Sequence, residues 1–332
     1  MTLILTGDDK MDNFQTFDLH FEDLPEEIKK ERKILSRTVT ALTLSAIISY
    51  SLLFLMEFII YLFFPSVTQS SWFLLGINDF FSLCVLGIFA LFTMKIPAVK
   101  PVEMTKMTLI SFLGYICASI AIMVAGSMIG NFISELVGSI FNREVENVVS
   151  ELVAENGTWQ LVVFVVITGP ILEELIFRKL LIDKLSRYGS KFSISLSAIL
   201  FGLFHGNFYQ FFYAAGIGII LGYIYVTCGK IRYSIILHMI LNFLGSVVPV
   251  YLEKFSQSTN QILQNTTMIY SISYLLTIPL GVMFIIKEIK NSKFYLLDGV
   301  LVKPSKMLPS NFGLIFFGIY IVSIFILNII FV

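Results

Sequence analysis

The stretch GPILEELIFR, residues 169–178, places two carboxylates and a guanidinium at the end of a segment that is otherwise apolar. The eleven residues before it, TWQLVVFVVIT, carry no charge. A Gly-Pro pair inside such a run predicts a kink or the start of a new helical segment. Ionisable groups within a membrane are costly and are functional candidates by default. We therefore expect a broken membrane helix that carries a functional polar cluster.

The composition of the whole chain agrees with a membrane environment. Its 332 residues are 56% hydrophobic and 14% charged, and the mean hydropathy is +0.84. Soluble domains have about 25% charged residues, so a soluble fold is excluded. The net charge is zero, which gives no indication of a nucleic-acid partner. The three cysteines are scattered and form no CxxC pair, so neither a disulfide framework nor a thiolate metal site is indicated.

The apolar runs predict the fold class: all-α, a polytopic membrane bundle of about eight to nine transmembrane helices. A spanning helix needs about 20 mostly apolar residues. The nine candidate spans are 39–64, 72–94, 107–132, 158–177, 192–206, 209–228, 233–250, 268–286 and 311–332. The fifth is short for a full crossing, which leaves eight and nine spans both open.

The first 38 residues are predicted to be a polar cytoplasmic segment. Residues 1–37 hold 15 of the 46 formal charges, nine acidic and six basic, and their start has no signal-peptide pattern. Within them, LPEEIKKERKIL (24–35) is amphipathic and predicts either a short helix along the membrane surface or a solvated tail. With the N-terminus inside and nine alternating spans, 21 of the 23 basic residues fall on the cytoplasmic side, which supports this orientation.

The two adjacent glutamates are expected to have different surroundings. Successive helical residues point about 100° apart, so Glu173 and Glu174 cannot share a face. Glu174 and Arg178 are at i,i+4 and can form an ion pair. Glu173 has no such partner in its own helix, so it must be solvated in a cavity, protonated, or paired with another span.

Histidines supply candidate partners for Glu173. Of three histidines, His20 lies in the polar tail, whereas His205 and His238 lie at or within predicted spans. The steps from Glu173 to His205 and from His205 to His238 are 32 and 33 residues, about one helical hairpin each. With a turn near Gly189, Glu173 lies 16 residues before it and His205 lies 16 after it, so antiparallel helices would bring them to similar depth. Each residue alone has about even odds of being structural, but their coincidence favours one active site.

The ordered set Glu-Glu-x-x-x-Arg, Phe-x-x-x-His and His-x-x-x-Asn resembles the motifs of the CPBP family. This family comprises the CAAX prenyl endopeptidases and the bacteriocin-processing, or Abi, intramembrane proteases. The resemblance covers residues 158–250 and is carried by Glu173-Glu174…Arg178, Phe201…His205 and His238…Asn242. It implies a bundle of about eight helices around an intramembrane cavity. It divides the chain into the N-terminal segment (1–38), leading helices with an outer loop (39–157), a catalytic core (158–250) and C-terminal helices (251–332).

The resemblance also implies an endopeptidase and a role for each matching residue. Glu173 and His205 would hold the attacking water, and His238 and Asn242 would stabilise the oxyanion. Glu174 and Arg178, with Phe201, would give structural support. These roles agree with general chemistry, because peptide hydrolysis needs a base for water and donors aimed at the developing oxyanion.

The sequence leaves two questions open: whether the reaction uses a metal, and whether the protein is an enzyme. Glu173, His205 and His238 could ligate Zn²⁺, since His₂Glu is a catalytic zinc ligand set. No HExxH motif is present, and a metal-free mechanism with no cofactor is favoured. The leading function is an intramembrane endopeptidase for a membrane-associated protein or peptide. A non-catalytic scaffold or bacteriocin self-immunity protein of the same fold is the alternative. A proton-coupled transporter is disfavoured because no internal repeat is apparent. The expected location is a bacterial plasma membrane, with the lipid bilayer and the peptide substrate as partners.

Overall fold

A computed structural model describes residues 25–100, 105–143, 147–291 and 304–331, and helices dominate this part of the chain. It contains no strand within those ranges, so the predicted all-α class is confirmed. The principal elements are α1 (Pro25–Phe63), α2 (Pro65–Thr68), α3 (Ser71–Thr93), α4 (Leu109–Phe141), α5 (Val148–Glu155), α6 (Thr158–Gln160), η1 (Leu161–Thr168), α7 (Gly169–Glu174), η2 (Leu175–Ile182), α8 (Asp183–Leu185), η3 (Ser186–Tyr188), α9 (Ser190–Phe204), α10 (Phe208–Cys228), α11 (Ile231–Asn242), η4 (Phe243–Val247), α12 (Val248–Ser256), α13 (Gln261–Asn291), η6 (Pro304–Lys306) and α14 (Phe312–Phe331).

Eight helices in the described ranges are long and apolar enough to cross a membrane. The fifth predicted span, 192–206, corresponds to α9, an apolar helix of 15 residues that is too short for this class. Large apolar side chains are exposed along α1, α4, α13 and α14, as expected for surfaces that face lipid. The chain is therefore an integral, multi-pass membrane protein.

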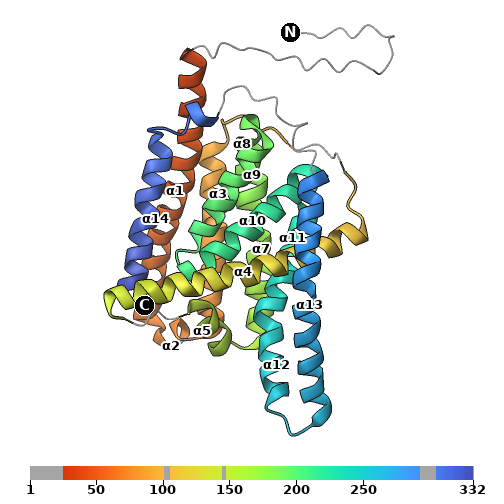
Figure 1. Ribbon diagram of the computed structural model, residues 1–332. Coiled ribbons are helices and arrows are strands. Elements are labelled where there is room, and N and C mark those ends of the chain that lie inside the picture. The colour runs from red at the N-terminus through yellow and green to blue at the C-terminus, as the bar shows by residue number, and fades with distance from the viewer. Residues whose placement is uncertain (1–24, 101–104, 144–146, 292–303, 332) are drawn as a thin grey trace, which may run out of the picture.

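The helices alternate in direction, which brings the basic connections to one end of the bundle. The connections α3–α4, α8–α9 and α10–α11, and the end of α13, lie at the same end as the start of α1, at the top of Figure 1. Lys95, Arg187, Lys230 and Lys290 belong to these segments. The predicted cytoplasmic N-terminus depends on this gathering of basic residues at one end of the bundle.

The amphipathic stretch before the first span does not form a separate surface helix. It continues directly into α1, which begins at Pro25 with Glu26 and Glu27 in its first turn. Tertiary contacts explain this correction. The Arg187 guanidinium lies 2.8 Å from the Glu31 carboxylate, and Leu35 is fully buried in the main core. The polar turns of α1 are therefore packed against the connection before α9.

The Gly169-Pro170 pair starts a new α-helical segment, as predicted. The preceding segment η1 is π-helical, and the Gly169 amide donates to the carbonyl of Phe164, five residues earlier. Pro170 then occupies the first turn of α7, where its missing N–H is tolerated. A second π-helical segment, η2, follows Glu174. Because π-helical turns are rare and often occur at functional sites, the break marks the region of interest.

Helix α4 crosses the bundle at a steep angle and packs closely against α10 (Figure 1). The contact is made by small residues. A Cβ added at Gly126 would lie 2.5 Å from the Tyr213 backbone, and one at Gly130 would lie 2.6 Å from the Phe208 carbonyl. Close approach of this kind is typical of helix packing in membranes. It fixes the first turns of α10 beside the cavity described next.

Candidate active site

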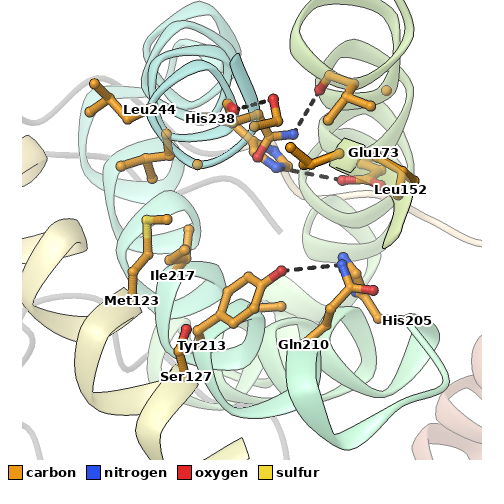
Figure 2. A pocket seen from close by; sticks show the side chains of 18 of the residues that line it. Met123, Ser127, Leu152, Glu173, His205, Gln210, Tyr213, Ile217, His238 and Leu244 are labelled. Carbon is orange, nitrogen blue, oxygen red and sulfur yellow. Dashed lines mark hydrogen bonds and ion pairs between the residues drawn. The ribbon is translucent and has the colours of Figure 1, made fainter. Parts of the chain in front are cut away.

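A cavity of about 840 Å³ lies within the bundle and contains all four predicted catalytic side chains. Glu173 comes from α7, His205 from the end of α9, and His238 and Asn242 from α11. Figure 2 shows Glu173 and His238 on one side of the cavity, and His205 on the other. Residues separated by up to 69 positions are thus brought to one space. Their catalytic roles remain predictions.

Glu173 and Glu174 have the different environments that the helix geometry predicted. The Glu173 side chain is 29% exposed and lines the cavity. The Glu174 side chain is fully buried, and its Oε2 lies 3.2 Å from Nε of Arg178, so the predicted ion pair is present. Of these two glutamates, only Glu173 is therefore accessible to a molecule in the cavity.

His238 lies between the two carboxylates. Its Nδ1 is 3.1 Å from Oε1 of Glu174, and its Nε2 is 3.6 Å from Oε2 of Glu173. Glu173 is thus paired with another span, one of the three outcomes left open by the sequence. The link from Glu174 to His238 was not predicted. It orients the imidazole, because a carboxylate on one ring nitrogen fixes the direction of the other.

Arg178 and Phe201 form the wall behind these groups. The Arg178 guanidinium is fully buried and lies 4.5 Å from the centre of the Phe201 ring, a cation–π contact. The same ring packs edge-on against His205 and His238, with centroids 5.0 and 5.8 Å apart. Phe201 therefore packs against both histidines, and its supporting role stays a prediction.

His205 is positioned by the turn between α9 and α10. Gly206 follows it with φ of +71°, and an added Cβ there would lie 2.8 Å from Ile324. The His205 Nδ1 is 2.9 Å from the Phe201 carbonyl oxygen. A carbonyl can only accept, so Nδ1 carries the proton and Nε2 of the neutral ring is an acceptor. His205 can therefore hold or activate a water molecule through Nε2.

Asn242 has a partner that the sequence did not indicate. Its Nδ2 donates to the Val165 carbonyl at 2.8 Å. At the end of η1 each backbone N–H bonds to the carbonyl five residues earlier, so the Val165 carbonyl would accept from residue 170. Residue 170 is proline, which has no N–H. Asn242 thus satisfies a backbone acceptor that Pro170 leaves without a donor. One N–H of the amide is used in this way, and the second remains for the cavity.

Sequence reasoning missed a second carboxylate in the cavity, beside that of Glu173. Asp79 of α3 lines the cavity and accepts a hydrogen bond from the hydroxyl of Thr168, just before the helix break. A lone Asp inside the second apolar run was the available signal. The polar cluster expected on the broken helix at residues 169–178 therefore does not include every carboxylate of the cavity. Gln210 and Tyr213 of α10 also line the cavity and were not singled out.

Glu173, His205 and His238, the ligands of the zinc alternative, do not form a compact metal site. Among the described residues, no three His, Cys, Asp or Glu side chains come together in a group that could hold a metal ion. One nitrogen of His238 faces Glu174, and the other faces Glu173. The arrangement suits a hydrogen-bonded imidazole better than a metal-bound one.

Comparisons with known proteins point to the same core. Residues 155–244 match the family described as Type II CAAX prenyl endopeptidase Rce1-like. The chain is also 29% identical over 126 residues to a Bacillus subtilis (strain 168) protein named "Putative membrane peptidase YdiL". That alignment covers 36% of this chain and 52% of the relative, so the chain spans about half the length of the relative. No solved structure gives a significant match. By the three motifs and by both comparisons, residues 155–244 are therefore similar to the CPBP/CAAX proteases.

Proposed function

We propose that this protein is an intramembrane endopeptidase that hydrolyses a peptide bond in a membrane-associated protein or peptide. The observation that carries the proposal is the meeting of Glu173, His205, His238 and Asn242 in one cavity within a membrane-spanning bundle. The name of the Bacillus relative and the family match support a peptidase. CAAX-type processing and the maturation of a peptide or bacteriocin are both compatible with this proposal.

In the proposed mechanism, water lies between Glu173 and His205. Glu173 takes a proton from this water as the oxygen attacks the carbonyl carbon of the substrate. The Nε2 acceptor of His205 holds the same water by its second proton, because its Nδ1–H is bonded to Phe201. The electron pair of the C=O bond moves to oxygen, and Glu173 later returns the proton to the departing amine.

Donors on α11 would stabilise the oxyanion. His238 can present Nε2–H when protonated, and its Nδ1 is fixed by Glu174. Asn242 has one amide proton left after its bond to Val165. Preorganised donors of this kind contribute strongly in a site that excludes bulk water. We propose a metal-free reaction, since every group named here acts without a metal.

The proposal extends to location and orientation. The alternation of helices and the basic connections at one end support a cytoplasmic N-terminus, by the rule that cytoplasmic loops are enriched in Lys and Arg. A bacterial plasma membrane is the proposed compartment. The alternative of a non-catalytic scaffold or immunity protein would not require this set of cavity side chains.

The test is proteolysis in liposomes by purified full-length protein. A library of membrane-associated peptides is incubated with the wild type and with Glu173→Gln, and the products are identified by mass spectrometry. We expect discrete cleavage by the wild type and none by the variant, which keeps the shape of the side chain but removes its basicity. Equal cleavage by both proteins would refute the proposal. Comparing the peptides of wild-type and variant membranes then identifies the substrate.

A further inference from the structure

A chain of oriented hydrogen bonds runs along the first turns of α10 and ends in the cavity. Asn207 caps this helix, and its Oδ1 accepts from the Gln210 amide at 2.9 Å. The Asn207 Nδ2 donates to Oε1 of Gln210, also at 2.9 Å. The Gln210 Nε2 then donates to the Tyr213 hydroxyl oxygen at 3.2 Å. The three side chains therefore form a directional relay from the helix cap to a phenol.

The direction of this relay is fixed by backbone groups. A backbone N–H can only donate, so the Asn207 atom that faces the Gln210 amide is its oxygen. The Asn207 Nδ2 also donates to the His205 carbonyl at 2.9 Å, and a carbonyl can only accept. Both backbone contacts therefore assign the same positions to the amide oxygen and nitrogen of Asn207. Because the Asn207 Nδ2 donates to Gln210, the Gln210 atom that faces it is the oxygen. The Tyr213 oxygen is therefore an acceptor in this chain.

The proton of the Tyr213 hydroxyl must point away from Gln210. In the part of the chain that the structure describes, no hydrogen-bond acceptor is recorded for this proton. Tyr213 lines the cavity and lies with Gln210 and His205 on the side opposite Glu173 and His238 (Figure 2). The relay thus leaves one O–H donor that a molecule in the cavity can use.

The donors on the opposite wall are engaged more fully. Asn242 gives one of its two amide protons to Val165, and His238 is held between two carboxylates. The Tyr213 hydroxyl can turn its proton toward a ligand without breaking a hydrogen bond, because among the described residues this proton has no competing protein acceptor. Of the three cavity donors Tyr213, His238 and Asn242, Tyr213 is therefore the least committed to protein partners.

We infer that Tyr213 is a further catalytic residue, whose hydroxyl donates a hydrogen bond to the carbonyl oxygen of the scissile peptide as negative charge develops there. This inference rests on the proposed peptidase function and adds a donor to it. No proton is transferred from the phenol. Asn207 and Gln210 are positioning residues, because they act only by turning the phenol proton toward the substrate.

The first experiment compares Tyr213→Phe with Tyr320→Phe in liposomes. Tyr320 is a partly buried tyrosine of α14 outside the cavity lining, so it controls for the loss of a phenol oxygen. Removing one oxyanion donor costs about 10²–10³ in rate. We expect Tyr213→Phe to lose kcat by that factor with KM within about twofold of wild type. Tyr320→Phe should keep wild-type kcat.

A second measurement tests the contact between Tyr213 and the oxyanion by binding alone, without turnover. A phosphinic peptide carries a tetrahedral oxyanion in place of the scissile carbonyl, and we measure its binding to each protein by competition with a fluorescent peptide. Tyr213→Phe should bind this analogue about 10²-fold more weakly. Binding of the uncleaved peptide to Glu173→Gln and to the Glu173→Gln/Tyr213→Phe double variant should agree within twofold.

The direction of the relay is tested by Gln210→Glu. The carboxylate has the same size but accepts the Tyr213 proton, so kcat should fall about as far as in Tyr213→Phe. In the Tyr213→Phe background, Gln210→Glu should cost nothing further, because both changes remove the same donor. A further large loss in the double variant would overturn the relay.

The outcomes separate this inference from the proposed function. If Glu173→Gln is inactive while Tyr213→Phe keeps full kcat and full affinity for the phosphinic peptide, the assignment of Tyr213 is wrong and the peptidase stands. If Glu173→Gln cleaves as fast as wild type, the peptidase mechanism fails and the role of Tyr213 fails with it.

Discussion

Glu174→Gln should lower the melting temperature as well as the activity, whereas Glu173→Gln should abolish activity and leave melting nearly unchanged. The two residues are adjacent, but Glu174 is fully buried between Arg178 and His238, and Glu173 is partly exposed in the cavity. The change from Glu to Gln keeps the shape of the side chain, so the comparison isolates the negative charge.

The structure sets the expected size of each effect. Removing one partner of a buried ion pair costs about 3–5 kcal/mol, because the other charge is left uncompensated. For Glu174→Gln that charge is the fully buried Arg178 guanidinium, whose nearest recorded carboxylate among the described residues is Glu174. For a chain of this size the melting temperature changes by about 2 °C per kcal/mol, so Glu174→Gln should lower it by roughly 6–10 °C. Glu173→Gln leaves Glu174 to compensate Arg178 and His238, so its cost should stay below about 1 kcal/mol.

The assay pairs thermal melting in detergent with peptide cleavage for Glu173→Gln, Glu174→Gln, Arg178→Gln and the Glu174→Gln/Arg178→Gln double variant. Arg178→Gln should resemble Glu174→Gln, and the double variant should lose less stability than the sum of the single changes. Early melting of Glu173→Gln, with Glu174→Gln folded but inactive, would show that the two roles are reversed.

Three further predictions concern orientation, metal and Asn242. Single cysteines at positions 187, 230 and 290, in a background without the native cysteines, should be labelled from the cytoplasmic side; two labelled from outside would overturn the orientation. Activity should survive dialysis against a strong chelator, and a loss that Zn²⁺ alone restores would contradict the metal-free mechanism. Asn242→Ala should lower kcat by about 10²–10³ through the lost donor, and should also lower melting by leaving the Val165 carbonyl without a partner at a cost of about 1–3 kcal/mol. Pro170→Ala supplies a backbone N–H in the same region. In the Asn242→Ala background it should restore the melting temperature but not kcat. Recovery of both would assign Asn242 a purely structural role.

The parts of the fold that depend on local pattern could be predicted from the sequence. Apolar runs indicated the spans, because the length of a membrane helix is set by the bilayer. The turn at Gly189, where φ is +92°, and the new helical start at Gly169 follow from the properties of glycine and proline. The pair of Glu174 and Arg178 follows from helical spacing alone. Each of these features is decided by residues close together in the chain.

The features that were missed depend on contacts between distant segments. The amphipathic stretch at residues 24–35 joins α1 because Glu31 pairs with Arg187, which is 156 residues away. Asn242 reaches Val165 across 77 residues, because Pro170 leaves a carbonyl open. Asp79 enters the cavity only because α3 packs beside α7. Periodicity and spacing within one segment carry no information about such partners.

The spacing of Glu174 and Arg178 has a consequence for how the protein is made. Both charges lie one turn apart on the same helix, so they can neutralise each other as soon as that helix forms during synthesis. Arg or Asp at the centre of an inserting helix costs about 2.5–3.5 kcal/mol on translocon scales, and a pair formed within the helix reduces this cost. His238 is synthesised 64 residues after Glu174 and can join the pair only once α11 has entered the membrane. The Glu174–Arg178 pair can therefore enter the membrane as a neutral unit before α9, α10 and α11 are made.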